Sequence, residues 1–574
     1  MSVTDIVIGM VGSGGDGIVA VGDILTATAA SEGIHCMQFK SFGPQIRGGE
    51  SSCTIHLSDK PVLSLGGNLD VLLVFNWDDY LRFSGELNVK KGVVVIADEK
   101  NVPESLPLND GIKPSEVFKL PFDELVKESG NPKSKNIIAL GALAQIFGLP
   151  RDGLKKSIER KFSKKKEEIL AANLKAIDIG INYAVSNNLK SVLQFSYKKE
   201  TSHYITTGNE ALAYGALFAG CRFFASYPIT PASEIMEWMS RELPKFGGTM
   251  VQAEDEISAA CMVVGASFGG VKAMTATSGP GLSLKIEALG LASMAELPLV
   301  AVNVQRGGPA TGIPTKYEQA DLQQAVYGMH GDAPHAVIAP SNVKDCFDAA
   351  VEAFNIAEQY QMPVIILSDQ FIGHRKETVS DFSRDLEVVG RETPKNPAKG
   401  EYKRFVVTPS GVSPMSYPGI AGGEYTCSGI EHNEAGSPVS SHKAHEIMSA
   451  KRERKLEHLA KNYKFIQRYG SARPDVGIIT WGSTCGAVRE AVEAAASLKL
   501  NVGAIIPRLI YPVQADVIND FIKGCKKIII VELSYSGQFR RYLSAFCRLP
   551  ENVVHLKSSG ARMFEASEIL ERIS

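Results

Sequence analysis

The sequence predicts a multidomain α/β protein built around parallel β-sheets. Apolar runs of about six residues recur along the chain, and each ends in a Gly, Pro or Ser turn that precedes a helical pattern. This alternation is typical of strand–helix units that add parallel strands to one sheet. The chain has 574 residues, which fits roughly three or four domains. In parallel sheets, ligands bind beyond the carboxyl ends of the strands, so the turns at those ends are the candidate sites.

The composition is that of an ordinary soluble globular protein. Apolar residues make up 44% of the chain and charged residues 22%. The formal net charge of −2 gives no electrostatic reason to expect nucleic acid or a membrane surface as a partner. No apolar run approaches the ~20 residues of a membrane span. The chain enters a strand at once, without a basic leader, and its nine scattered cysteines include no Cys-x-x-Cys pair. We therefore expect a cytoplasmic chain that holds no metal itself.

The first domain is expected over residues 1–190, and its opening turn has three competing interpretations. Strand-like residues from Asp5 lead into Gly12-Ser-Gly-Gly-Asp-Gly and then a helix, which is formally a dinucleotide-binding pattern. The next strand ends near Lys40, where a ribose-binding acid is required. An NAD site therefore lacks one of its parts. The remaining alternatives are an anion site at the helix start or a turn used only for close packing.

The central domain is expected over residues 204–375, and three of its turns follow strands. These turns are Tyr227–Pro231, Ser278–Gly281 and Arg306–Thr315. Because the carboxyl ends of parallel strands meet at one edge of a sheet, we expect the three turns to form one pocket.

Three side chains in or near these turns have specific chemistry. Thr230 lies between Ile229 and Pro231 in a turn whose proline leaves the hydroxyl free for a ligand. Glu256 begins an apolar helix, where a carboxylate is electrostatically tolerated. Arg306 follows a strand in a glycine-rich loop, and arginine suits bidentate recognition of a carboxylate.

The remainder of the chain is expected to hold a long loop and a last domain. Residues 376–470 form a loop and a linker helix, with Pro, Gly and Ser enriched over residues 394–441. Loops of this length without regular structure are usually functional or disordered. Residues 471–574 read as a further strand–helix domain, to which we assign no catalytic residue.

Together, these motifs resemble a known family. Tyr227-Pro-Ile-Thr-Pro, Glu254-Asp-Glu-Ile-Ser-Ala-Ala, Ser278-Gly-Pro-Gly and Arg306-Gly-Gly-Pro-Ala-Thr-Gly occur in that order. They closely resemble the α subunit of 2-oxoacid:ferredoxin oxidoreductases, here fused to a γ domain, and the resemblance covers nearly the whole chain. It implies an N-terminal γ domain, a pyrimidine-binding domain of the thiamine-diphosphate-enzyme type and a transketolase C-terminal-like domain.

The resemblance also implies roles for individual residues. Glu256, followed by Gly265, would bond the aminopyrimidine N1′ of thiamine diphosphate and activate it. Thr230 and Arg306 would act with it in catalysis. Substrate binding would fall to Thr230, Arg306 and Thr315. The other cofactor-binding positions would be Tyr227, Pro228, Ile229, Ser278 and Gly279. Coenzyme A would lie near Gly14, Gly15 and Arg47. No metal ligand is expected in this chain.

The implied reaction is oxidative decarboxylation of a 2-oxoacid with coenzyme A to an acyl-CoA, CO₂ and reduced ferredoxin, reversible toward CO₂ fixation. 2-Oxoglutarate is the expected substrate, with pyruvate or a branched-chain 2-oxoacid as alternatives and an NAD-linked oxidoreductase as a different class. A β subunit would carry a [4Fe–4S] cluster and the Mg²⁺–diphosphate site, in a dimer of heterodimers. Lys316 and His335 are both candidates for a distal carboxylate, although a structural role is expected for the histidine.

Overall fold

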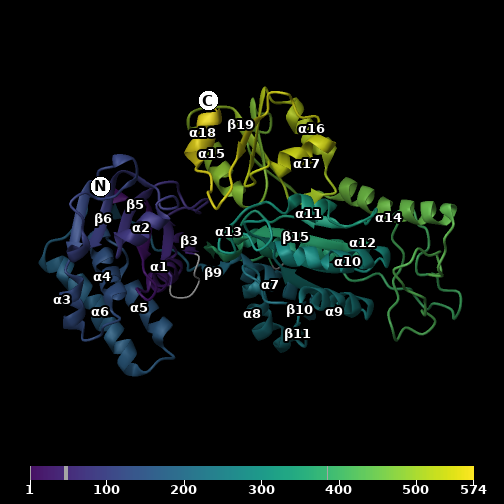
Figure 1. The fold of residues 1–574 in the computed structure, drawn as a ribbon, viewed down its shortest axis with the longest axis horizontal. Coiled ribbons are helices and arrows are strands. Elements are labelled where there is room, and N and C mark those ends of the chain that lie inside the picture. Colours follow the sequence, from purple (N-terminus) through teal and green to yellow (C-terminus); the bar gives the residue numbers. More distant parts are fainter. Residues whose placement is uncertain (1, 44–48, 384, 574) are drawn as a thin grey trace. The chain divides into compact units, whose positions relative to one another are not determined.

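The fold is described from a computed structural model that covers residues 2–43, 49–383 and 385–573 (Figure 1). The chain divides into two compact units, and each is described by itself. Unit 1 comprises Met1–Thr206 and His374–Asp381. Unit 2 comprises Thr207–Gly373 and Phe382–Ser574. The four-part division expected from the sequence remains a prediction.

Unit 1 is built on a mixed eight-stranded sheet, most of which is coloured purple to blue in Figure 1. Strand β2 pairs antiparallel with β4 and parallel with β5, so the sheet combines both kinds of neighbour. A separate short pair joins β1 (Ser2–Val3) to β8 (Gln194–Phe195). The order of the main sheet is β7 (Glu116–Leu120), β6 (Val89–Asp98), β5 (Leu69–Val74), β2 (Asp5–Gly12), β4 (Ser51–Ser58), β3 (His35–Phe42), β16 (Lys376–Val379) and β9 (Tyr204–Thr207).

Strand β16 departs from the sequence expectation. Its residues fall where the long loop was predicted to begin, yet they pair antiparallel with β3 through Lys376 opposite Gln38. This strand has only four residues, two of them charged. Its pairing depends on a partner far away in the chain, which local sequence does not reveal.

Two helices of unit 1 approach so closely that glycine is required at both positions. A Cβ on Gly141 or on Gly180 would clash with a backbone carbonyl of the facing helix, Ile177 or Ile138 respectively. The helices are α1 (Ile18–Glu32), α2 (Trp77–Phe83), α3 (Phe122–Ser129), α4 (Lys135–Phe147), α5 (Arg151–Phe162) and α6 (Glu167–Ser186), with short 3₁₀ turns at Glu99–Asn101 and Asn109–Gly111. Because the backbones of α4 and α6 are in contact at these glycines, the two helices pack their apolar faces against each other. This contact fixes the position of the two helices in the core.

The central sheet of unit 2 confirms the predicted parallel α/β fold. All its neighbours pair in parallel except β14 with β20, which comes from the C-terminal region. Its order is β11 (Thr249–Gln252), β10 (Phe223–Ser226), β12 (Ala273–Thr277), β13 (Leu299–Gln305), β15 (Pro363–Asp369), β14 (Ala336–Ile338) and β20 (Leu509–Tyr511). The connecting helices are α7 (Gly208–Phe218), α8 (Ser233–Glu242), α9 (Glu256–Phe268), α10 (Gly279–Met294), α11 (Leu322–Tyr327), α12 (Val343–Tyr360) and α13 (Gln370–His374).

The C-terminal region forms a five-stranded sheet, yellow-green to yellow in Figure 1, whose core is continuous with that of the central sheet. Trp481 and Ile505 pack in the same apolar cluster as Leu322 and Ile365. The strand order is β17 (Ile466–Gly470), β19 (Val502–Pro507), β18 (Val476–Thr480), β21 (Lys527–Glu532) and β22 (Val554–Lys557). The helices are α15 (Cys485–Ser497), α16 (Ala515–Lys523), α17 (Gln538–Phe546) and α18 (Ala566–Ile573), and a 3₁₀ turn lies at Gly482–Thr484. A further 3₁₀ turn, Leu243–Phe246, follows α8 in the central region.

The long segment between β16 and α14 (His442–Asn462) is attached to the core through buried ion pairs and a hydrogen bond from Arg404. Glu296 is fully buried, and its carboxylate pairs with Lys451 at 2.6 Å and with Lys455. Arg404, from the long segment, donates to the backbone oxygen of Glu296 at 2.7 Å. Burial alone would raise the pKa of the Glu296 carboxyl, but the three cations outweigh it and lower that pKa. The sequence predicts α14 only as a linker helix, whereas two of its lysines are buried and hold Glu296.

None of the helices that the structure describes is long and apolar enough to cross a lipid bilayer.

Removing the Glu296 carboxylate should destabilise unit 2. Glu296→Gln leaves Lys451 and Lys455 buried without a counter-charge, so we expect the free energy of unfolding to fall by about 3–5 kcal/mol. Urea denaturation of the purified chain measures this loss. Glu242→Gln is the matched control, because Glu242 pairs with exposed Lys245, and its cost should stay below about 1 kcal/mol. Equal stability losses in the two variants would contradict this account of the cluster.

Candidate active site

The three turns predicted to share a pocket follow three neighbouring strands of the central sheet. Strands β10 and β12 pair in parallel, and so do β12 and β13. Their carboxyl ends therefore lie at one edge of the sheet. The turns Tyr227–Pro231, Ser278–Gly281 and Arg306–Thr315 leave the sheet there, as the sequence predicted.

Arg306 connects two of these turns. Its side chain is buried (7% exposed), and Nη1 donates to the backbone oxygen of Thr230 at 2.6 Å. Among the described residues, its buried Nε has no hydrogen-bond partner. Burial lowers the pKa of this guanidinium, and nearby Asp321 acts in the opposite direction. An arginine that donates one N–H to a backbone oxygen and has a further N–H without a partner is suited to bind an anionic oxygen.

Glu256 is a buried carboxylate at the first position of α9. Asp255 caps this helix by accepting the Ser258 amide at 2.7 Å, which leaves Glu256 free of a capping role. Glu256 is 7% exposed, whereas Glu254 is exposed. No hydrogen bond to the Glu256 carboxylate is found within the part of the chain that the structure describes. A buried acid without a partner is costly and marks a candidate functional group.

The start of α10 lies beside this carboxylate. A Cβ on Gly281 would stand 2.8 Å from Glu256 Oε1 and would clash with Thr277 Oγ1. Ser278 occupies the N-cap of α10 without forming a side-chain cap bond, and its buried hydroxyl has no partner among the described residues. The cradle formed by Ser278 and the two glycines that follow fits a polar ring placed against Glu256.

Lys285 was missed by the sequence analysis. It is fully buried, and its Nζ donates to the Glu256 backbone oxygen at 3.1 Å and to Thr275 Oγ1 at 3.1 Å. Burial lowers its pKa to about 8, although the Glu256 charge acts to raise it. The available signal was a single lysine between the apolar residues Leu284 and Ile286 of α10, seven positions after Ser278.

A cavity of about 460 Å³ opens next to Arg306 and the start of α10. Its lining residues are Gly279, Pro280, Ser283, Arg306, Gly307, Gly308, Pro309, Ala310, Glu318, Ala320, Asp321, Gln324, Ser534, Tyr535, Ser536 and Gln538. Asp321 is a half-buried acid of this lining, and removal from water raises the pKa of its carboxyl to about 6. This volume suits a small ligand with a few polar groups.

The C-terminal region contributes one wall of this cavity, which the sequence analysis did not expect. The turn Ser534–Gln538 follows β21, and Gln538 fixes it in place. Its Nε2 donates to the Ala320 oxygen at 2.6 Å, and its Oε1 accepts the Gln323 amide at 3.0 Å. The available signal was that this turn also follows the carboxyl end of a parallel strand.

Other predicted residues lie elsewhere in unit 2. Tyr227, Pro228 and Ile229 do not line the cavity, and Tyr227 is 40% exposed. Thr315 also does not line it and lies two residues beyond Ile313, which bridges to Gly307. His335 is buried, and both its ring nitrogens bond to backbone oxygens, at 2.9 and 2.8 Å. These bonds confirm the structural reading of this histidine.

In unit 1, the candidate coenzyme-A positions lie in an exposed turn. Gly14 and Gly15 are exposed, and Gly15 has a φ of 102°, which favours glycine. Asp16 Oδ2 accepts the Ser13 amide at 2.8 Å, so that amide is not available to a phosphate. Arg47 lies outside the described residues.

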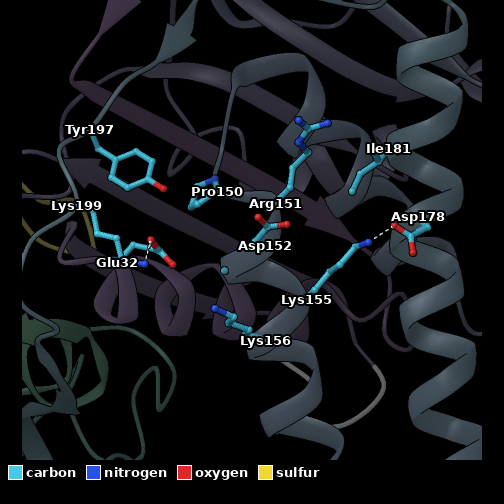
Figure 2. A pocket seen from close by; sticks show the side chains of 11 residues that line it. Glu32, Pro150, Arg151, Asp152, Lys155, Lys156, Asp178, Ile181, Tyr197 and Lys199 are labelled. Carbon is cyan, nitrogen blue, oxygen red and sulfur yellow. Dashed lines mark ion pairs between the residues drawn. The ribbon is translucent and has the colours of Figure 1, made fainter.

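A second cavity, of about 390 Å³, lies in unit 1 at the start of α5 (Figure 2). Figure 2 shows two ion pairs in its lining: Lys199 reaches Glu32 at 2.8 Å, and Lys155 reaches Asp178. Asp152 adds a further negative charge to the lining. Since Lys155 and Lys199 already have acidic partners, this cavity is a weaker candidate for an anion than the cavity at Arg306.

Known sequence families match three stretches of the chain. Residues 7–183 match the family described as pyruvate ferredoxin/flavodoxin oxidoreductase. Residues 214–451 match pyruvate flavodoxin/ferredoxin oxidoreductase, thiamine diphosphate-binding. Residues 474–569 match pyruvate:ferredoxin oxidoreductase core domain II.

Individual relatives cover most of the chain. It is 38% identical over 375 residues to the 2-oxoglutarate synthase subunit KorA of Methanothermobacter marburgensis, an alignment covering 65% of this chain and 99% of that protein. It is 32% identical to the 2-oxoglutarate oxidoreductase subunit KorA of Mycobacterium tuberculosis, over 94% of this chain and 87% of that one. A solved 2-oxoglutarate:ferredoxin oxidoreductase from Magnetococcus marinus, with 2-oxoglutarate, coenzyme A and succinyl-CoA bound, is 37% identical. It covers 100% of this chain and 99% of that chain, with a TM-score of 0.93.

Substituting the glycine next to Glu256 should disturb the site. Gly281→Ala places a methyl group against the buried Thr277 and Glu256 side chains, so we expect a stability loss of about 1–3 kcal/mol despite the better helix propensity of alanine. Thermal unfolding measures this loss.

Gly290→Ala is the matched control on the same helix. The nearest atom to its new methyl group is His330 Cε1, at 4.0 Å. This variant should therefore be as stable as the parent or gain up to about 1 kcal/mol. Equal melting temperatures for the Gly281→Ala variant and the parent would show that the start of α10 is not tightly packed.

Proposed function

The chain belongs to the 2-oxoacid:ferredoxin oxidoreductase family, and on this premise we propose that it is the fused γ–α chain of a 2-oxoglutarate:ferredoxin oxidoreductase. The reaction converts 2-oxoglutarate and coenzyme A to succinyl-CoA and CO₂ and passes two electrons to ferredoxin. Relatives named for 2-oxoglutarate align over most of the chain, which favours this substrate over pyruvate or a branched-chain 2-oxoacid.

The observation that carries the proposal is the buried Glu256 carboxylate beside the start of α10. It is shielded from water, has no partner among the described residues and faces a glycine-lined surface. These features fit the aminopyrimidine of thiamine diphosphate. When bound, thiamine diphosphate supplies a carbon nucleophile and an electron sink for decarboxylation. Glu256 would hold the proton at N1′, and the Ser278 hydroxyl would find its missing partner on the same ring.

Substrate binding is assigned to the neighbouring turns. Arg306 offers its unsatisfied N–H to the 2-oxoacid carboxylate, while the Thr230 backbone oxygen fixes the guanidinium. The Thr230 hydroxyl would meet the keto oxygen, since the two turns already touch. Thr315 would enter this group only if its loop moved toward the cavity, because it does not line the cavity in this structure.

The remaining parts of the enzyme are assigned to other places. A β subunit would bring the Mg²⁺–diphosphate site and the [4Fe–4S] cluster that passes electrons singly to ferredoxin, in a dimer of heterodimers. The subunit names of the relatives agree with a multi-subunit enzyme. Gly14 and Gly15 remain proposed as the coenzyme-A side of unit 1, with Arg47 as the candidate cation.

Replacing the proposed activating acid should abolish turnover while leaving the fold intact. We expect Glu256→Gln to lower 2-oxoglutarate-dependent dye reduction by about 100-fold or more, because the amide cannot hold the proton at N1′. Glu254→Gln is the control, since Glu254 is exposed two residues earlier, and its activity should be that of the parent. Near-parental activity of Glu256→Gln would rule out the assignment.

We also expect this chain to be inert without its partner. Expressed alone it should be colourless, bind thiamine diphosphate weakly or not at all and reduce no dye. Brown colour and activity should appear only after co-expression with the β subunit. Mass spectrometry of an active preparation checks this expectation, and a brown, active sample that contained only this polypeptide would disprove it.

A further inference from the structure

Asp321 has the position of a helix cap but does not act as one. It is the N-cap residue of α11, yet its side chain forms no cap hydrogen bond. Elsewhere in unit 2, Asp255 caps α9 and Asn342 caps α12 by accepting amides at 2.7 and 2.8 Å. An aspartate at an N-cap ordinarily satisfies one of the free amides of the first turn. The Asp321 carboxylate is therefore available for contacts other than helix capping.

The structure holds this carboxylate at the cavity wall. Asn303 Nδ2 donates to Asp321 Oδ2 at 3.0 Å, and the Asp321 amide donates to Gln305 Oε1 at 3.0 Å. Both partners are fully buried on β13, immediately before Arg306. Two bonds to a rigid strand fix the position of the carboxyl relative to the guanidinium that follows that strand.

The start of α10 is shaped to accommodate the same group. A Cβ on Gly279 would stand 3.0 Å from Asp321 Oδ2 and 3.3 Å from Oδ1. Without a side chain at position 279, the carboxyl comes up against the backbone at the N-terminal end of α10, where the helix carries partial positive charge. Glycine at this position thus gives the carboxyl room at the cavity.

The charges that face Asp321 come from two places. Arg306, after β13, attracts its charged form, and Glu318, in the loop before α11, opposes it. In turn, Asp321 is the charged neighbour that acts on Arg306. Arg306 has one N–H bonded to Thr230 and another unsatisfied, so the balance of charge beside it depends on Asp321.

We propose that Asp321 is a positioning and specificity residue of this pocket, which sets its affinity for anionic substrates by controlling the net charge beside Arg306. An ionised Asp321 partly cancels the guanidinium charge and weakens the hold on a carboxylate. When Asp321 is neutral, the full positive charge of Arg306 is available to attract the substrate carboxylate. The residue would thereby couple substrate affinity to pH. This inference rests on the proposed function only in naming a 2-oxoacid as the anion.

The pH dependence has a defined sign. Burial raises the pKa of the Asp321 carboxyl to about 6, so the group gains its charge as the pH rises through that region. The dissociation constant and the KM for an anionic ligand should both increase over that interval, because the attraction of Arg306 is progressively offset. Affinity should be highest on the acidic side.

The test uses the complete complex with its partner subunit and two measurements. Calorimetry gives the dissociation constant of 2-hydroxyglutarate, which keeps both carboxylates but lacks the reactive carbonyl. Steady-state assays give the KM for 2-oxoglutarate. Between pH 5.5 and 8.5, we expect both constants of the parent to rise about fivefold or more, and kcat to change less than either.

Asp321→Asn keeps the size of the side chain and removes its titration. At pH 8 this variant should bind 2-hydroxyglutarate about fivefold more tightly than the parent, with little dependence on pH. A purely structural role would instead weaken binding at every pH. Asp332→Asn is the control, because Asp332 is exposed beyond the end of α11, and its pH profile should match that of the parent.

Failure of the inference and failure of the proposed function are distinguishable. An active complex in which Asp321→Asn keeps the parental pH profile overturns the inference alone. Tight, Asp321-dependent binding of 2-hydroxyglutarate without any 2-oxoacid-dependent reduction overturns the proposed function alone. If Asp321→Asn does not fold, the parental profile decides, because constants that stay flat from pH 5.5 to 8.5 overturn the inference.

Discussion

The site depends on the absence of side chains at the start of α10. Gly279 and Gly281 leave room for two carboxylates, Asp321 against the first and Glu256 against the second. The N-terminal end of a helix carries partial positive charge, which makes it a tolerable neighbour for acids removed from water. A longer side chain at either glycine would separate the helix from the acids, and the surface on which the proposed chemistry rests would be lost.

The parallel sheet turns this local packing into a cavity. Since β10, β12 and β13 run side by side in one direction, the turns carrying Thr230, Ser278 and Arg306 emerge at the same edge. The turn after β21 then adds a wall from more than 200 residues further along the chain, fixed by Gln538. The cavity therefore needs both the central and the C-terminal sheets of unit 2 to be in place.

Two buried glutamates in unit 2 differ in whether their carboxylates have direct partners. Glu296 is surrounded by Lys451, Lys455 and Arg404, which compensate its burial and tie the long segment to the core. Among the described residues, the Glu256 carboxylate forms no hydrogen bond or ion pair, and Lys285 acts on it only as a nearby charge. A buried acid without a direct partner is tolerated mainly where a ligand completes it, so the contrast supports the functional role proposed for Glu256 and a structural role for Glu296.

The sequence by itself determined the parallel α/β class, the three strand-end turns and the start of an apolar helix, α9, at Glu256. These follow from local patterns: apolar runs, Gly and Pro turns, and the spacing of apolar residues in a helix. Only the tertiary structure decided that Lys285 lies beneath Glu256, that Asp321 turns away from its own helix, that β16 joins the sheet of unit 1 and that Ser534–Gln538 closes the cavity. Each of these depends on contacts between residues that are distant in the chain. Local propensity carries no information about which distant neighbours will meet, because burial and packing select them only when the whole fold forms.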